Sequence, residues 1–115
     1  EGKSKQEIRE EIEERFDYEL SPSFRDIWSD YYFDESCAMT VPASLIAFFD
    51  SIDFEDSIRN AVALGGDADT LACITGGISE AFYGGVPKDI KVEVIKRLPS
   101  EFLEIIDRFY EEFDL

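Results

Sequence analysis

The stretch that most constrains this chain is a glycine turn that opens a helical pattern. It reads GGDADT at residues 65–70 and continues as LACITGGI at residues 71–78. The two glycines can adopt backbone angles that other residues rarely take. Asp67, Asp69 and Thr70 then fall at the cap and first turn of the next helix, where amide donors lack intrahelical partners. The pattern therefore predicts a turn between two helices at this point.

The paired aspartates allow two interpretations. In the first, Asp67 caps the helix and Asp69 is favoured by the helix macrodipole, without any ligand. In the second, Asp67, Asp69 and Thr70 place hard oxygen ligands in one short span and form half of a magnesium or manganese site. A capping aspartate does not require a second aspartate two residues further on. An EF-hand calcium loop is a weaker third idea, because it needs more alternating oxygen ligands and a late glutamate.

A wider stretch around this turn is similar to a known family. Residues 61–76, AVALGGDADTLACITG, resemble the C-terminal signature of the ADP-ribosylglycohydrolases, which include dinitrogenase-reductase-activating glycohydrolase. The resemblance extends through SCAMTVP at 36–42 and YGGVP at 83–87. Two other family motifs, a Thr-Asp-Asp-Thr and a Gly-Asp-Ala-x-Gly turn near the N-terminus, do not occur in these residues. The resemblance therefore implies the C-terminal portion of such an enzyme.

The resemblance also implies a fold and a site. It implies an all-α fold, a compact orthogonal helical domain over residues 1–115 that forms the C-terminal part of the ADP-ribosylglycohydrolase fold. Asp67, Asp69 and Thr70 fall on the family's metal-ligand positions. Gly65 and Gly66 are the places where backbone could approach substrate closely. No catalytic residue is assigned within this chain.

The implied activity is removal of ADP-ribose from modified proteins or from related ADP-ribosyl compounds. Two Mg²⁺ or Mn²⁺ ions would be shared with the N-terminal portion of the same enzyme, so the chain alone is expected to be inactive. A rival hypothesis from another class is a non-catalytic helical interaction module that keeps the fold but lacks the N-terminal metal ligands. A Thr-Asp-Asp-containing segment upstream in the same reading frame would distinguish the two.

Composition excludes several other classes of function. The chain has 11 basic and 27 acidic residues, a net charge of −16, which repels nucleic-acid backbones and anionic lipid. We therefore expect neither a nucleic-acid nor a membrane partner. The sequence contains no histidine. Serine-histidine and cysteine-histidine nucleophiles and histidine-ligated zinc are thus excluded, and carboxylates with oxygen-bound metals remain.

The two cysteines bear on the cellular compartment. Cys37 and Cys73 lack the close spacing of a zinc or redox motif, and we expect both to be reduced, buried residues of a cytoplasmic protein. No apolar stretch reaches the length of a membrane span, and no signal peptide opens the chain. The first residue, Glu1, is not a methionine, which is weak support for a fragment.

Cap residues and hydrophobic spacing predict a series of helices joined by short turns. Residues 30–40 lose periodicity, and a packed loop is expected there rather than a strand. The predicted helices cover about Lys5–Tyr18 after a capping box that starts at Ser4, a short segment after Ser21-Pro22, Pro42–Asp50, Asp53 to Gly65, the glycine turn to Gly84-Gly85, a segment from Pro87, and a terminal segment after Pro99-Ser100.

Burial can also be predicted from these patterns. The helix over Pro42–Asp50 is apolar nearly all round, which is typical of a central helix. We expect Thr40 to cap it, with Met39 in the core. Val62 belongs to the buried stripe of the following helix, and the apolar side of the terminal helix, Phe102 to Phe113, should pack into the core.

The helix that leaves the glycine turn carries small residues four apart, at Ala68, Ala72 and Gly76. Small residues at this spacing allow a neighbouring helix to approach very closely. Such packing would hold Asp67 and Asp69 rigidly enough to orient a ligand.

Overall fold

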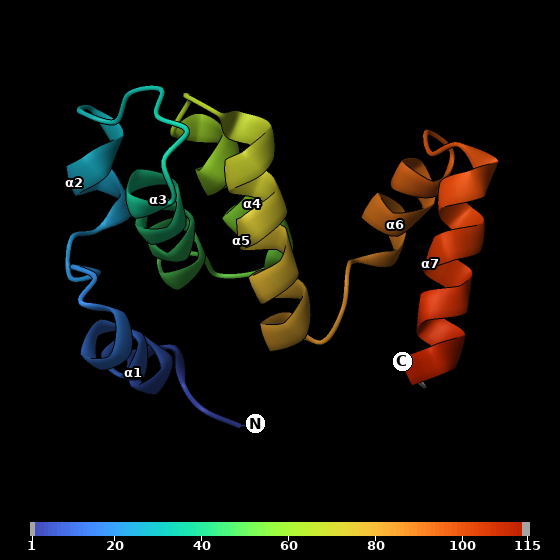
Figure 1. Cartoon of the computed structure of the whole chain (residues 1–115), viewed down its shortest axis with the longest axis horizontal. Helices are drawn as coiled ribbons and strands as arrows, with labels where there is room; N and C mark the ends of the chain where they lie inside the picture. The colour runs from blue at the N-terminus through green and yellow to red at the C-terminus, as the bar shows by residue number, and fades with distance from the viewer. Residues whose placement is uncertain (1, 114–115) are drawn as a thin grey trace. The chain divides into compact units, whose positions relative to one another are not determined.

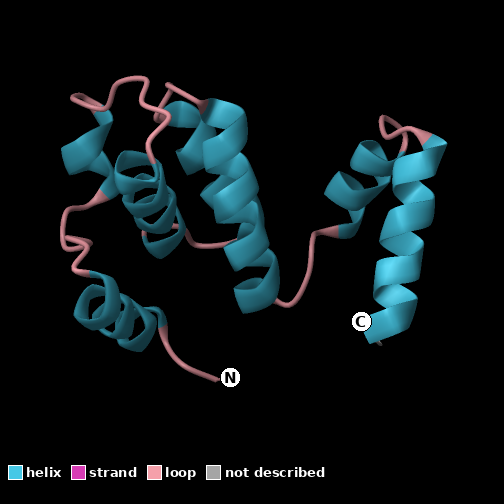
Figure 2. Cartoon of the chain, viewed as in Figure 1, coloured by secondary structure: helices cyan, strands magenta, loops and turns pink. Residues whose placement is uncertain are grey.

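The computed structural model describes residues 2–113, and all regular structure in this range is helical (Figures 1 and 2). This confirms the predicted all-α class. The helices are α1 Lys5–Phe16, α2 Phe24–Trp28, α3 Cys37–Phe49, α4 Phe54–Ala63, α5 Ala68–Tyr83, α6 Lys88–Ile95 and α7 Ser100–Phe113. None of the described helices is long and apolar enough to cross a membrane.

The chain divides into two compact units, Glu1–Gly85 and Val86–Leu115. The boundary follows Gly84 and Gly85, both of which have positive φ. Gly84 is the left-handed C-cap of α5, so the glycine pair ends this helix as its sequence predicts. Each unit is described separately below.

Helix α3 is the centre of the first unit. All residues from 43 to 49 are buried, which agrees with the prediction that an all-round apolar helix is central. It packs against α4 and α5, and Figure 1 shows α3 and α5 side by side. Phe48 is fully buried in one of two core clusters, together with Leu20.

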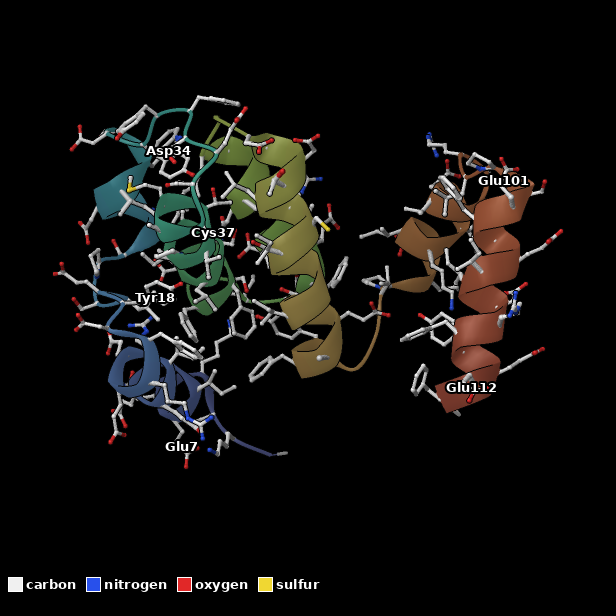
Figure 3. The ribbon with its side chains drawn as sticks, in the orientation of Figure 1. Glu7, Tyr18, Asp34, Cys37, Glu101 and Glu112 are labelled. Atoms are coloured by element: carbon white, nitrogen blue, oxygen red, sulfur yellow. The ribbon has the colours of Figure 1, made fainter. Side chains whose placement is uncertain are left out.

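The start of α3 differs from the prediction. The helix begins at Cys37, more than a turn before Pro42, which lies inside it. Thr40 therefore does not cap the helix, and its hydroxyl instead donates to the Asp34 carbonyl at 3.1 Å. The Asp34 carboxylate accepts from the Ser36 amide at 2.6 Å and organises the segment before the helix. Figure 3 labels Asp34 and Cys37 in this segment.

Three burial predictions in the first unit are corrected by the structure. Cys37 is exposed and Met39 is 38% exposed, because both lie on the additional first turn of α3, outside the core. Val62 is 52% exposed rather than buried. It follows the fully buried Ala61, and consecutive helical residues point about 100° apart.

Cys73 is also exposed, although it was predicted to be buried. It lies two residues from Leu71 and two residues from Thr75, both fully buried. Residues two apart on a helix point to nearly opposite sides, so Cys73 must face away from the core. Cys37 and Cys73 are both free thiols.

Helices α4 and α5 pack closely, as the small residues of α5 predict. A Cβ added at Gly76 would lie 3.2 Å from the Ile58 Cδ1 atom of α4, tighter than an ordinary contact. Helix α4 begins at a conventional cap, in which the Asp53 carboxylate accepts from the Asp56 amide at 2.8 Å. The predicted start of α4 is thus confirmed.

The interface between the three central helices contains small hydroxyl side chains. Ser44, Ser57, Thr75 and Ser79 are all completely buried. The Thr75 hydroxyl of α5 donates to the Ser44 carbonyl of α3 at 3.0 Å. This bond connects two helices through a residue no larger than valine, so the helices approach closely without large apolar side chains between them.

The second unit contains α6 and α7, and neither helix has a fully buried residue. The apolar side of α7 is 52% exposed at Phe102 and 60% exposed at Phe113. The prediction that this side packs into a core is therefore wrong for the unit as described. A pair of helices this short has too little partner surface to cover a full apolar side.

Candidate metal-binding loop

The candidate site is the turn between α4 and α5. Gly65 and Gly66 have φ values of 76° and 61°, in the left-handed region where glycine is favoured. The Gly65 amide donates to the Val62 carbonyl at 3.1 Å as α4 ends. Helix α5 then starts with a bond from the Leu71 amide to the Asp67 carbonyl at 3.0 Å. The two glycines thus allow one helix to end and the next to begin within a few residues.

Asp67 is in the N-cap position of α5, but its carboxylate makes no capping hydrogen bond among the described residues. The capping interpretation therefore accounts for its position and not for its side chain. Asp53, the N-cap of α4, makes the expected bond. The Asp67 carboxylate therefore does not act as a helix cap.

The Asp67 and Asp69 carboxyl groups come together at the start of α5. A hydrogen bond with the Asp67 side chain, followed by bonds from the Thr70 and Asp69 amides, lowers the pKa of Asp69. The Thr70 amide lies 3.1 Å from the Asp69 Oδ1 atom. Neighbouring carboxylates repel each other, and a proton or a cation between them relieves this repulsion. The pair therefore has the chemistry to attract a cation.

A tyrosine borders the same loop. The Tyr31 hydroxyl is buried and has no hydrogen-bond partner within residues 2–113. Burial is the main cause that raises the pKa of Tyr31, and the charges of Asp34 and Asp67 add to it. The nearby Thr40 hydroxyl lowers this pKa, although it does not reach hydrogen-bonding geometry. Sequence reasoning did not select Tyr31, because the run from Tyr31 to Phe33 indicates only a packed loop.

The two glycines differ in their surroundings. A Cβ added at Gly66 would lie 3.0 Å from Tyr31 Cε1, 3.3 Å from Phe33 Cα and 3.4 Å from the Tyr32 carbonyl oxygen. No described atom lies within 4 Å of the corresponding point at Gly65. The backbone at Gly66 is therefore covered by the chain itself, and Gly65 is the more open of the two positions proposed for substrate approach.

The side chains in this loop are of the chemical type that binds a hard divalent cation. Carboxylates and a hydroxyl are ligands that Mg²⁺ and Mn²⁺ prefer. Asp69 and Thr70 are exposed, and Asp67 is partly exposed, so a cation could reach them from solvent. The described residues contain no group of three or more acidic, cysteine or histidine side chains placed to hold a metal. The loop can therefore supply part of a ligand set.

Comparison with protein families gives the class of protein. Residues 2–115 match the family model described as ADP-ribosylglycohydrolase. The match covers essentially the whole chain, so the chain belongs to the ADP-ribosylglycohydrolase family, and the all-helical fold agrees with this assignment. No curated protein and no solved structure gives a significant match. Membership of this family suggests a hydrolase.

Proposed function

We propose that this chain is part of a metal-dependent hydrolase that removes ADP-ribose from modified proteins or from related ADP-ribosyl compounds. The observation that supports the proposal most directly is the start of α5, where Asp67 makes no capping hydrogen bond and the exposed Asp69 follows two residues later. Family membership supports the class of reaction.

Asp67, Asp69 and Thr70 would be the ligands that this chain contributes to a two-metal site. Bound Mg²⁺ or Mn²⁺ would supply Lewis-acid chemistry toward ribose oxygens and water. The chain's own task would be to bind and to orient. The close packing of α4 and α5 at Gly76 holds the loop between them, and the open backbone at Gly65 leaves room for substrate.

The remaining ligands would come from an N-terminal portion of the same enzyme. Two carboxylates and a hydroxyl are fewer than the six ligands that Mg²⁺ usually takes. We therefore propose that the chain alone binds metal weakly and turns over no substrate. A cytoplasmic location, with no nucleic-acid or membrane partner, fits the charge of −16.

Paramagnetic broadening by Mn²⁺ tests the proposed ligands, because it detects weak binding. Mn²⁺ is added to the ¹⁵N-labelled chain, and amide signals of residues 66–71 are compared with those of α6. We expect selective broadening around the loop, which Asp67→Asn and Asp69→Asn each reduce strongly. Asp53→Asn is the matched control, since it alters a helix start that is at least as acidic and caps normally. Equal broadening in all four proteins would contradict the assignment.

The alternative is a non-catalytic helical module, favoured by the absence of a three-ligand acidic, cysteine or histidine cluster in residues 2–113. The two proposals differ in what lies upstream. A Thr-Asp-Asp-containing segment in the same reading frame, and metal-dependent release of ADP-ribose by the joined protein, would favour the enzyme. Weak metal binding and no release of ADP-ribose by the joined protein would favour the module.

A further inference from the structure

The ammonium group of Lys5, at the start of α1, lies in a shell of oxygen atoms. Its Nζ atom donates to the Ser51 carbonyl at 2.6 Å, the Phe48 carbonyl at 2.8 Å and the Tyr83 hydroxyl at 2.8 Å. The Ser51 hydroxyl and the Phe49 carbonyl follow at 3.2 and 3.3 Å. The five oxygens belong to the end of α3, to Ser51 just after it and to the end of α5, and none belongs to α1.

Aromatic rings complete the surroundings of this ammonium group. It lies 4.7 Å from the centre of the Phe48 ring, 5.2 Å from Tyr83 and 5.6 Å from Phe82. Ring faces at these distances attract a cation. The rings also pack edge to face against each other, Phe48 with Phe82 at 5.2 Å and Phe82 with Tyr83 at 5.1 Å, so they support their own arrangement.

The shell offers more acceptors than a lysine can use. An ammonium group has three N–H donors and faces five oxygens. Two of the oxygens are carbonyls at the C-terminal end of α3, where the helix dipole is negative, and a third is the Ser51 carbonyl just after the helix. The Tyr83 hydroxyl is itself 2.8 Å from the Ser51 hydroxyl and 3.1 Å from the Ser51 carbonyl, so part of the shell is held together without Lys5. Surplus carbonyl oxygens around one point are typical of sites that replace the water shell of K⁺.

We propose that these oxygens and rings form a binding site for an ammonium-sized monovalent cation, and that the chain fills this site with Lys5 to hold α1 in place. Helix α1 has no fully buried residue. Its other attachments include the partly buried Ile8 and Ile12 and the Arg9 guanidinium, which lies 4.8 Å from the Phe49 ring and 3.9 Å from the Asp50 carboxylate. Lys5 is thus the residue that joins α1 to the ends of both α3 and α5.

Replacement of Lys5 by alanine should open the site to free cations. We would measure the unfolding temperature of Lys5→Ala in KCl, NH₄Cl and LiCl at equal ionic strength. K⁺ and NH₄⁺ should raise this temperature relative to Li⁺, because a ligand that binds only the folded state stabilises it. The wild type should show no such difference between salts. Lys5→Met should show none either, since its side chain fills the same space, and Lys3→Ala should behave as wild type because Lys3 pairs with Glu11 on the surface.

Equal unfolding temperatures of Lys5→Ala in all three salts would overturn the proposal. If that variant shows no cooperative unfolding, the wild type provides the decisive measurement. Acetic anhydride labelling, followed by mass spectrometry, compares Lys5 with the exposed Lys3. The shell should slow labelling of Lys5 by at least about tenfold, because reaction requires local opening. Labelling of both lysines at the same rate would equally overturn the proposal.

Discussion

The ring of Tyr31 lies directly against Gly66, so that a Cβ atom at residue 66 would come within 3.0 Å of the Tyr31 Cε1 atom. The contact joins the loop before α3 to the turn that carries Asp67. It makes the two glycines of that turn unequal, although both have positive φ.

Gly66→Ala should therefore destabilise the fold more than Gly65→Ala. Both substitutions place a side chain in the left-handed region, at a cost of about 1–2 kcal/mol. Only the one at residue 66 also displaces Tyr31, which should add about 1–3 kcal/mol of overpacking. Urea unfolding of both variants measures the difference. An equal decrease in the free energy of unfolding for both variants would show that the Tyr31 contact does not contribute to stability.

The two helix-capping aspartates should respond differently to truncation. Asp53→Ala removes a side chain that accepts the Asp56 amide at 2.8 Å, and should cost about 1 kcal/mol. Asp67→Ala removes a carboxylate without such a bond and should cost less than about 0.5 kcal/mol. Thermal unfolding without divalent cations is the measurement. A larger loss for Asp67→Ala would restore the capping interpretation of this residue.

The phenol of Tyr31 should titrate above the ordinary range of a tyrosine, because burial raises its pKa. The unfolded chain loses this proton near pH 10, before the folded chain does. Stability that depends on the neutral phenol is therefore complete below pH 10 and is lost as the pH rises from there through the folded pKa. Absorbance at alkaline pH should show a late phase that Tyr31→Phe removes. The same late phase in the variant would assign it to another tyrosine.

Both cysteines should react in the folded protein, because Cys37 and Cys73 are exposed free thiols. A thiol-specific chromogenic reagent should modify two equivalents without denaturant, one in each of Cys37→Ser and Cys73→Ser. Neither substitution should change stability by more than about 0.5 kcal/mol, as is usual for exposed positions. Reaction only after addition of denaturant would mean that both thiols are buried, as the sequence analysis predicted.

Local patterns were enough to predict the helix order and the turn at Gly65 and Gly66. The start of α3 could not be predicted, because Pro42 is typical of a first helical turn and nothing local shows that the helix passes through it. The contact between Tyr31 and Gly66 joins residues far apart in the sequence. The shell around Lys5 consists mainly of backbone carbonyls, which have no sequence signature. These three features depend on tertiary packing, so a single sequence does not contain a local signal for them.

The buried hydroxyls of Ser44, Ser57, Thr75 and Ser79 have a consequence for how stability varies with temperature. The heat capacity of unfolding rises with the apolar surface that becomes hydrated and falls with the polar surface. Serine and threonine at these four positions place polar surface in the core where apolar surface would otherwise be buried. The chain's heat capacity change should lie below the usual value of about 12–15 cal/mol/K per residue. The free energy of unfolding would then vary along a shallow curve, and the fold would be lost gradually with warming.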